Sequence, residues 1–195
     1  MTNQAKILAF AGSVREASFN KRLVQIAATG AKLAGAEVTY IDLKNYPMPL
    51  FNEDLEAKEG LPQAVLEFKR LMKAHQGFLI ACPEYNSSIT PLLKNTIDWV
   101  SRPEPGEAPM ALSCFRGKVA AIMATSPGGL GGLRGLVHLR SILESIGVLV
   151  IPEQKAISNA YQAFDDTGNL IDVKEKEAIA IIGARLTEVT AKLKV

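Results

Sequence analysis

The stretch that decides the fold is Ile7-Leu8-Ala9-Phe10-Ala11-Gly12-Ser13-Val14-Arg15-Glu16-Ala17-Ser18-Phe19-Asn20. Its first residues form an apolar run that is too short for a helix and is typical of a strand buried on both faces. Gly12 ends the run. Apolar residues then recur at helical spacing from about Ser18 to Ala34, and Gly35 marks the end of this predicted helix. A strand, a polar turn and a helix in this order predict the first unit of a parallel α/β sheet.

The same alternation continues along the chain. Four further apolar runs are predicted strands (38–41, 77–82, 119–124 and 148–151), and helical periodicity covers 61–74, 92–100, 133–145 and 173–193. Buried strands separated by helices predict one parallel sheet with helices on both faces, and right-handed crossovers leave few topologies. Five strands favour the doubly wound, flavodoxin-like order 2-1-3-4-5 over the six-stranded alternative. We expect a single domain spanning 1–195.

Composition excludes several classes of partner. The 195 residues carry a formal charge of only +2, which gives no electrostatic footprint for nucleic acid. No apolar run approaches the ~18 residues that span a bilayer, and the polar start, residues 1–6, shows no secretory signal. Cys82, in an apolar run, is expected to be a buried thiol, and Cys114, in a loop, a free surface thiol. Without a disulfide framework, we expect a cytoplasmic protein.

Open α/β sheets bind ligands outside the carboxyl ends of their strands, where the strand order reverses. The loop after the first strand lies at this edge. A phosphate there would meet the amides of a helix N-terminus, with Ser13, Ser18 and Asn20 as neutral donors and Arg15 as a charged one. Alternatively, Ser18 is only a helix N-cap and Arg15 is only solvated.

Two more loops are expected at the same edge. After the third strand, Pro83-Glu84-Tyr85-Asn86-Ser87-Ser88 offers a stiff turn, a flat aromatic surface and an amide for a planar, polar-edged ring. The alternative is an ordinary turn in which Glu84 is an exposed charge. After the fourth strand, the glycine-rich run from Ser126 to Gly135 lacks the ending of a phosphate-binding nucleotide loop. It favours close approach of a large ring or a partner chain, and a flexible connection is the alternative.

At this point the chain resembles the NAD(P)H-dependent FMN reductases of flavodoxin-like fold, whose relatives include azoreductases, chromate reductases and quinone reductases. The resemblance spans nearly the whole chain. It rests on three motifs, each after the corresponding strand: Gly12-Ser13-Val14-Arg15 with Ser18 and Asn20; Pro83-Glu84-Tyr85-Asn86-Ser87-Ser88-Ile89 with Leu93-Lys94-Asn95-Thr96-Ile97-Asp98-Trp99; and the glycine run ending in Arg134.

The resemblance implies a role for each loop. Ser13, Arg15, Ser18 and Asn20 would hold the FMN phosphate. The isoalloxazine would be lined by Pro83, Glu84, Tyr85 and Asn86, largely through main-chain groups. Ser126 and Gly129 would close the other side. Relatives usually have Pro-Gly where this chain has Thr90-Pro91, and commonly Gly or a bulkier residue at Ser87, so the surface beyond the ring differs here.

The implied activity is ping-pong hydride transfer from NADPH or NADH, with NADPH the family-based expectation, to a quinone, an azo compound, a chromate-type oxyanion or a free flavin. The chemistry belongs to the flavin, so no catalytic protein residue is expected. The alternative is an FMN-binding electron carrier or regulatory module without nicotinamide turnover. Such carriers are typically acidic, unlike this chain.

Two further expectations concern the chain's own histidines and its assembly. His75 and His138 are expected to be structural or surface residues, and no His/Cys spacing indicates a metal site. The resemblance also implies a homodimer or homotetramer. The Tyr46-to-Leu55 loop and the Lys94-to-Pro109 region are the interface candidates, and Trp99 is either part of that interface or buried in its own subunit.

Overall fold

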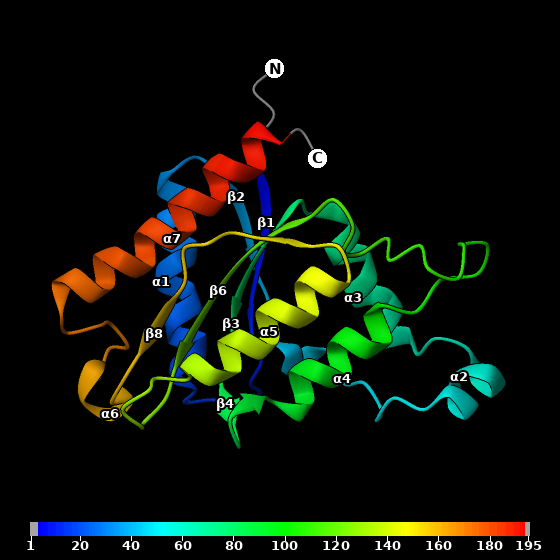
Figure 1. The fold of residues 1–195 in the computed structure, drawn as a ribbon, viewed down its shortest axis with the longest axis horizontal. Helices are drawn as coiled ribbons and strands as arrows, with labels where there is room; N and C mark the ends of the chain where they lie inside the picture. Colours follow the sequence, from blue (N-terminus) through cyan, green and yellow to red (C-terminus); the bar gives the residue numbers. More distant parts are fainter. Residues whose placement is uncertain (1–3, 194–195) are drawn as a thin grey trace.

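The computed structural model describes residues 4–193. A parallel sheet in the order β2-β1-β3-β6-β7 forms its centre, and a further strand, β8, also pairs with β6 (Figure 1). The strands are β1 (Lys6–Ala11), β2 (Glu37–Tyr40), β3 (Gly77–Ala81), β6 (Val119–Thr125), β7 (Leu149–Val150) and β8 (Lys155–Ile157). This order confirms the predicted flavodoxin-like topology, because β7 and β8 are two pieces of the fifth strand.

Helices cover both faces of the sheet. One layer contains α1 (Phe19–Leu33) and α7 (Val173–Lys192), and the other contains α3 (Gln63–Ala74), α4 (Pro91–Val100) and α5 (Leu133–Ser145). Shorter elements are the 3₁₀ turn η1 (Leu43–Asn45), α2 (Glu53–Glu59) and α6 (Ala160–Ala163). The predicted helices at 92–100, 133–145 and 173–193 are confirmed to within one residue at each end, with Thr90 capping α4 through Leu93 N at 3.2 Å.

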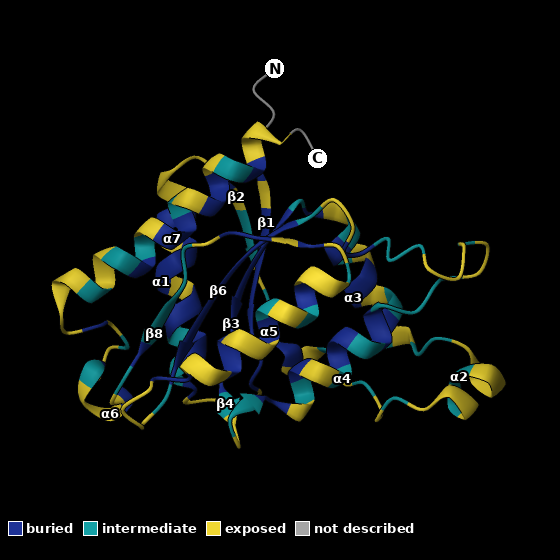
Figure 2. Ribbon diagram, viewed as in Figure 1, coloured by how far each residue is buried: buried dark blue, intermediate teal, exposed yellow. Residues whose placement is uncertain are grey.

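The central strands are buried on both faces, as their uninterrupted apolar sequence predicts. Alternate residues face opposite helical layers: Ile7 and Ala9 belong to the core under α1 and α7, whereas Leu8 and Phe10 belong to the core under α3, α4 and α5. Figure 2 shows the buried sheet between helices whose outer faces are exposed. The two layers leave the strand ends as the places where polar loops can gather.

Three local differences separate the structure from the sequence-based expectation. Residues 148–151 do not form one continuous fifth strand, because the chain leaves the sheet near Pro152 and re-enters as β8. The loop after β3 contains a two-stranded hairpin of β4 (Glu84–Tyr85) and β5 (Ser88–Ile89). Cys114 is fully buried rather than a surface thiol, because its loop packs beneath α3, with Sγ 3.8 Å from Lys69 O.

Trp99 is also fully buried within its own subunit, where its indole Nε1 donates to Pro49 O at 2.7 Å. Of its two alternatives, burial is therefore the one observed. Across residues 4–193, none of the helices combines the length and the apolar character needed to cross a bilayer. Residues 1–3, part of the polar start considered for a secretory signal, lie outside the described residues.

Candidate functional site

A small hollow lies at the carboxyl edge of the sheet and is lined by residues of β4, α6 and the first turn of α1. In Figure 1, β4 and α6 lie at the end of the molecule opposite the chain termini. The volume of the hollow is about 80 Å³. We call it the edge hollow, and its lining consists of Ser13, Arg15, Ser18, Phe19, Asn20, Pro83, Glu84, Tyr85, Thr125, Ser126, Pro127 and Tyr161. Eight of the ten residues predicted to bind the cofactor are in this set; Asn86 and Gly129 are not.

The β1–α1 loop supplies two serine hydroxyls and an arginine guanidinium. Ser13 and Ser18 are buried, and Ser18 occupies the N-cap position of α1 without making a side-chain cap hydrogen bond. The first turn of α1 contains no acidic residue to offset the positive end of the helix dipole. Arg15 is exposed, and within residues 4–193 its guanidinium has neither an ion-pair partner nor a hydrogen-bond acceptor. The loop can therefore offer several donors to an anion.

Asn20 is buried and already bonded to the chain. Its amide donates to Thr125 O at 2.8 Å and accepts from Thr125 N at 3.1 Å. These two bonds attach the start of α1 to the end of β6. The Asn20 side chain therefore fixes the position of these two walls of the edge hollow relative to each other. One amide hydrogen and one lone pair of the side-chain oxygen are left for a ligand.

Glycine allows the β1–α1 loop to approach α4. A Cβ at Gly12 would lie 3.0 Å from Leu93 Cβ and 3.3 Å from Thr90 Oγ1. The Thr90 hydroxyl donates to Gly12 O at 2.8 Å while it caps α4. Thr90-Pro91 thus gives a capped helix that holds the first loop in place.

The β4–β5 hairpin forms a second wall. Pro83 is buried, and Tyr85 is 52% exposed beside the edge hollow. Asn86 and Ser87 occupy the two-residue turn with φ of 50° and 66°. Both central residues have the positive φ of a type I′ hairpin turn, which Asn tolerates and Gly prefers. Asn86 therefore shapes the hairpin and lies outside the lining.

The Glu84 carboxylate is directed at α5. It accepts from Arg134 Nε at 2.9 Å and from Gly135 N at 3.0 Å. Burial raises the pKa of Glu84, but these hydrogen bonds and the Arg134 charge outweigh it, so the pKa lies below its ordinary value. Glu84 is thus an ionised and paired side chain whose charge is neutralised outside the edge hollow.

The glycine-rich run serves close packing by the chain itself. A Cβ on Gly131 would lie 2.7 Å from the Ile157 carbonyl carbon, and one on Gly132 would lie 2.8 Å from Ala124 Cβ. Both residues also have positive φ. Nothing lies within 4 Å of the position that a Cβ on Gly129 would take. The first part of the run is therefore open, whereas the second is tightly packed.

Sequence reasoning missed a fourth wall, residues 158–161 after β8. Ala160 N donates to Ser126 O at 3.0 Å, and Ser158 Oγ donates to Gly129 O at 2.6 Å. Tyr161 lines the edge hollow, where its ring packs edge-on against the Phe19 ring with the two ring centroids 5.5 Å apart. The feature that could have revealed this wall is β8, the second part of the split fifth strand. Because β8 is parallel to β6, the residues after it must lie at the same edge of the sheet.

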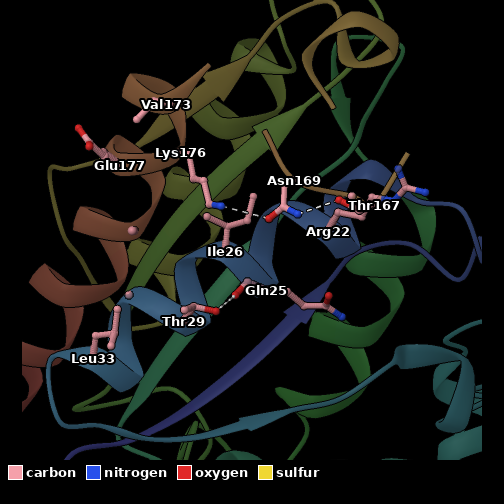
Figure 3. Close-up of a pocket in the computed structure, with 13 residues that line it drawn as sticks. Arg22, Gln25, Ile26, Thr29, Leu33, Thr167, Asn169, Val173, Lys176 and Glu177 are labelled. Carbon is pink, nitrogen blue, oxygen red and sulfur yellow. Dashed lines mark hydrogen bonds between the residues drawn. The ribbon is translucent and has the colours of Figure 1, made fainter. Parts of the chain in front are cut away.

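A wider hollow of about 550 Å³ lies between α1 and α7 (Figure 3). Two of its polar side chains are bonded within it: Lys176 Nζ donates to Asn169 Oδ1 at 3.2 Å, and Thr29 Oγ1 donates to the Gln25 backbone carbonyl at 3.0 Å. It is an open groove away from the strand ends. We place the candidate site in the edge hollow because donors from four chain segments converge there.

The histidines lie outside the edge hollow. His75 is buried, with Nδ1 2.7 Å from Leu71 O and Nε2 2.9 Å from Thr39 Oγ1. His138 lies on α5 with Nδ1 2.9 Å from Ser88 Oγ. Within the described part of the chain, no group of three or more His, Cys, Asp or Glu side chains is placed to hold a metal ion.

Comparison with known proteins identifies the family. Residues 5–162 match the family model described as NADPH-dependent FMN reductase. The chain is 39% identical to an NAD(P)H-dependent FMN reductase of Pseudomonas aeruginosa, over 92% of this chain and 91% of the relative. It is 35% identical to an NAD(P)H:quinone oxidoreductase of Solanum tuberosum, over 97% and 94%.

A solved structure agrees. The flavoenzyme NAD(P)H:(acceptor) oxidoreductase of Paracoccus denitrificans superposes with a TM-score of 0.80 at 25% identity, over 96% of this chain and 98% of that chain. The sequence matches and the fold agree. The chain therefore belongs to the NADPH-dependent FMN reductase family of oxidoreductases, with FMN and NAD(P)H as its cofactors.

Proposed function

We propose that this enzyme passes electrons from NAD(P)H through FMN to a small acceptor, and that the edge hollow holds the FMN phosphate. The supporting observation is the donor set at the start of α1. Arg15 lacks a partner within residues 4–193, Ser18 sits at the N-cap without a cap bond, and Ser13 is buried alongside them. A phosphate dianion there would satisfy the guanidinium, the hydroxyls and the helix dipole together.

The volume of the edge hollow fits one end of a flavin. Ligand pockets that enclose a whole drug-sized molecule are roughly 300–1,000 Å³, whereas this one is about 80 Å³. We therefore assign the phosphate and the ribityl chain to the edge hollow and the ring to the open surface beside it. Pro83, Tyr85 and Pro127 offer apolar and aromatic surface for a ring, and Ser126 lines the hollow next to Pro127.

Some of the predicted contacts take a different form in this proposal. Glu84 and Asn86 contribute to the ring site through the main chain of the hairpin, since the Glu84 carboxylate is paired with Arg134 and Asn86 lies in the turn. Asn20 acts through its brace to Thr125. Gly129 does not line the hollow, but its backbone is open to a ligand because nothing lies within 4 Å of the position of an added Cβ.

Bound FMN would supply the redox chemistry, accepting hydride from the nicotinamide and returning electrons to the acceptor. The protein binds the flavin, orients it and leaves one face open. Quinones are the acceptors most directly supported, because a relative that matches nearly the whole chain is named a quinone oxidoreductase. We propose ping-pong turnover, in which the oxidised nicotinamide leaves before the acceptor enters, with NADPH as the preferred donor. We also propose that the protein is a single domain, that it is cytoplasmic and that it assembles as a homo-oligomer.

The test is steady-state oxidation of NADPH by purified, FMN-loaded protein with a benzoquinone as acceptor. We expect NADPH consumption well above that of the flavin-free protein, and parallel double-reciprocal lines when both substrates are varied. Protein that binds FMN but consumes no NADPH above the flavin-free control would overturn the reductase assignment. Intersecting lines would overturn the ping-pong order alone.

A further inference from the structure

The most heavily bonded charged side chain beside the edge hollow is Glu84. Its side chain is only 7% exposed, yet it begins on the hairpin that lines the hollow and ends on a different element. One oxygen accepts from Arg134 Nε at 2.9 Å and also from Arg134 Nη2, and the other accepts from Gly135 N at 3.0 Å. A single carboxylate therefore connects the loop after β3 to the start of α5.

The start of α5 lacks a cap of its own. Its N-cap residue is Gly132, which has no side chain and adopts φ 93°. The first amides of a helix have no intrahelical acceptor, and one left unpaired in a buried place is costly. Gly135 is buried, so the Glu84 carboxylate supplies, from another segment, the acceptor that a serine or aspartate N-cap would otherwise provide.

The hairpin and the helix are also in close contact at this point. A Cβ on Gly135 would lie 3.3 Å from Ser88 O and 3.5 Å from Glu84 Cβ, so glycine allows the helix backbone to lie against the hairpin. One turn further along α5, His138 Nδ1 lies 2.9 Å from Ser88 Oγ. Polar contacts thus join both strands of the hairpin to α5, one through Glu84 and one through Ser88. Tyr85 lies between these two residues in the sequence.

We propose that Glu84, through its pair with Arg134 and its bond to Gly135 N, is a positioning residue for the flavin ring. It fixes the hairpin that carries Tyr85 relative to the glycine-rich loop that carries Ser126 and Pro127. This inference rests on the proposed function, since the ring is assigned to the surface between those two loops. Glu84 acts through the backbone and touches neither the phosphate nor the reacting atoms.

The test compares affinities for FMN and riboflavin, measured by quenching of flavin fluorescence, in Glu84→Gln and Arg134→Ala. The glutamine keeps the shape and an acceptor for Gly135 N but loses the charge that faces Arg134. Arg134 is 56% exposed, so its truncation is compatible with folding. We expect each variant to bind both flavins about tenfold more weakly, because a lost bond to a charged group frees the ring end.

Three further readouts separate positioning from a general loss of structure. Visible circular dichroism of the bound flavin should change in both variants. Glu84→Gln combined with Arg134→Ala should weaken binding no more than either change alone, since both remove the same pair. The matched control is the Arg185–Glu188 pair on α7, which is remote from the hollow: Arg185→Ala should leave both affinities and the dichroism unchanged.

The outcomes are distinct. If folded Glu84→Gln and Arg134→Ala bind both flavins as tightly as the wild type, the pair is an ordinary surface ion pair and the inference is wrong. If FMN binding falls while riboflavin binding does not, the pair acts on the phosphate end, which also overturns it. If the wild type itself binds neither flavin, it is the proposed function that fails.

Discussion

Arg15 illustrates what one side chain decides at this site. It is exposed, and within residues 4–193 no carboxylate holds it, whereas Arg134 beside the same hollow is paired with Glu84. The guanidinium and a helix N-terminus with no acidic residue in its first turn together offer an anion a charged donor and the positive end of the helix dipole. The expected consequence is selectivity for the phosphorylated flavin.

We predict that Arg15→Ala weakens FMN binding by at least about tenfold, because a hydrogen bond to a charged group contributes roughly 1.5–3 kcal/mol. Riboflavin, which lacks the phosphate, should bind almost as before. Fluorescence titration of both flavins measures the ratio, and Arg70→Ala, at an exposed position on α3, is the control for removal of a surface arginine. Equal losses for the two flavins would place the phosphate contact elsewhere.

At the scale of elements, the packing of α1 on α7 fixes where α1 begins. Gly30 and Gly183 lie at the crossing, where a Cβ on Gly183 would fall 1.9 Å from Ala27 O and one on Gly30 would fall 2.1 Å from Ala180 O. The helix backbones are therefore in direct contact. Because α1 presents its first turn to the edge hollow, this crossing links the C-terminal helix to the site.

We predict that Gly183→Ala lowers the free energy of unfolding by about 3 kcal/mol, since overpacking of a tight contact typically costs 1–3 kcal/mol and backbone atoms yield poorly. Urea denaturation followed by far-UV circular dichroism measures the change. Gly129→Ala is the matched control, because nothing lies within 4 Å of its added Cβ, and its stability should be unchanged or slightly higher. A similar, small effect for both variants would contradict the tight crossing.

At the scale of the whole molecule, a charged network attaches the long segment between α4 and β6 to α3. Lys73 Nζ contacts Glu104 Oε1 at 2.7 Å and Glu107 Oε1 at 2.8 Å. The hydrogen bond from Glu104 N, then that from Lys73, lowers the pKa of Glu107 from its ordinary 4.5 to about 2. Stability from this carboxylate is thus complete above pH 4.5 and is lost as the pH falls towards 2.

We predict that Glu107→Gln is less stable than the wild type at neutral pH, and that the difference shrinks as the pH falls from about 4.5 to about 2. The physical reason is that protonation removes from the wild type the same charge that the substitution removes. Chemical denaturation at a series of pH values measures the difference. A gap that stays constant across this window would show that Glu107 is not preferentially ionised in the folded protein.

The sequence by itself determined the order of elements and the chemistry available at the strand ends. Short apolar runs such as Ile7–Ala11 favour strands, and Thr90-Pro91 and Gly35 are local helix signals, so most strands and helices followed from local sequence patterns. The placement of the three polar loops at one edge followed from parallel topology alone. Eight of the ten predicted residues accordingly line one hollow.

Only the tertiary structure decided which of those polar groups remain available. Asn20 is bonded to Thr125 and Glu84 to α5, while Arg15 is left without a partner in the described chain. The break in the fifth strand that brings Tyr161 to the hollow depends on pairing with β6. Such partners lie up to 105 residues apart. Local sequence patterns therefore fix which donors exist, whereas long-range packing determines which remain free for a ligand.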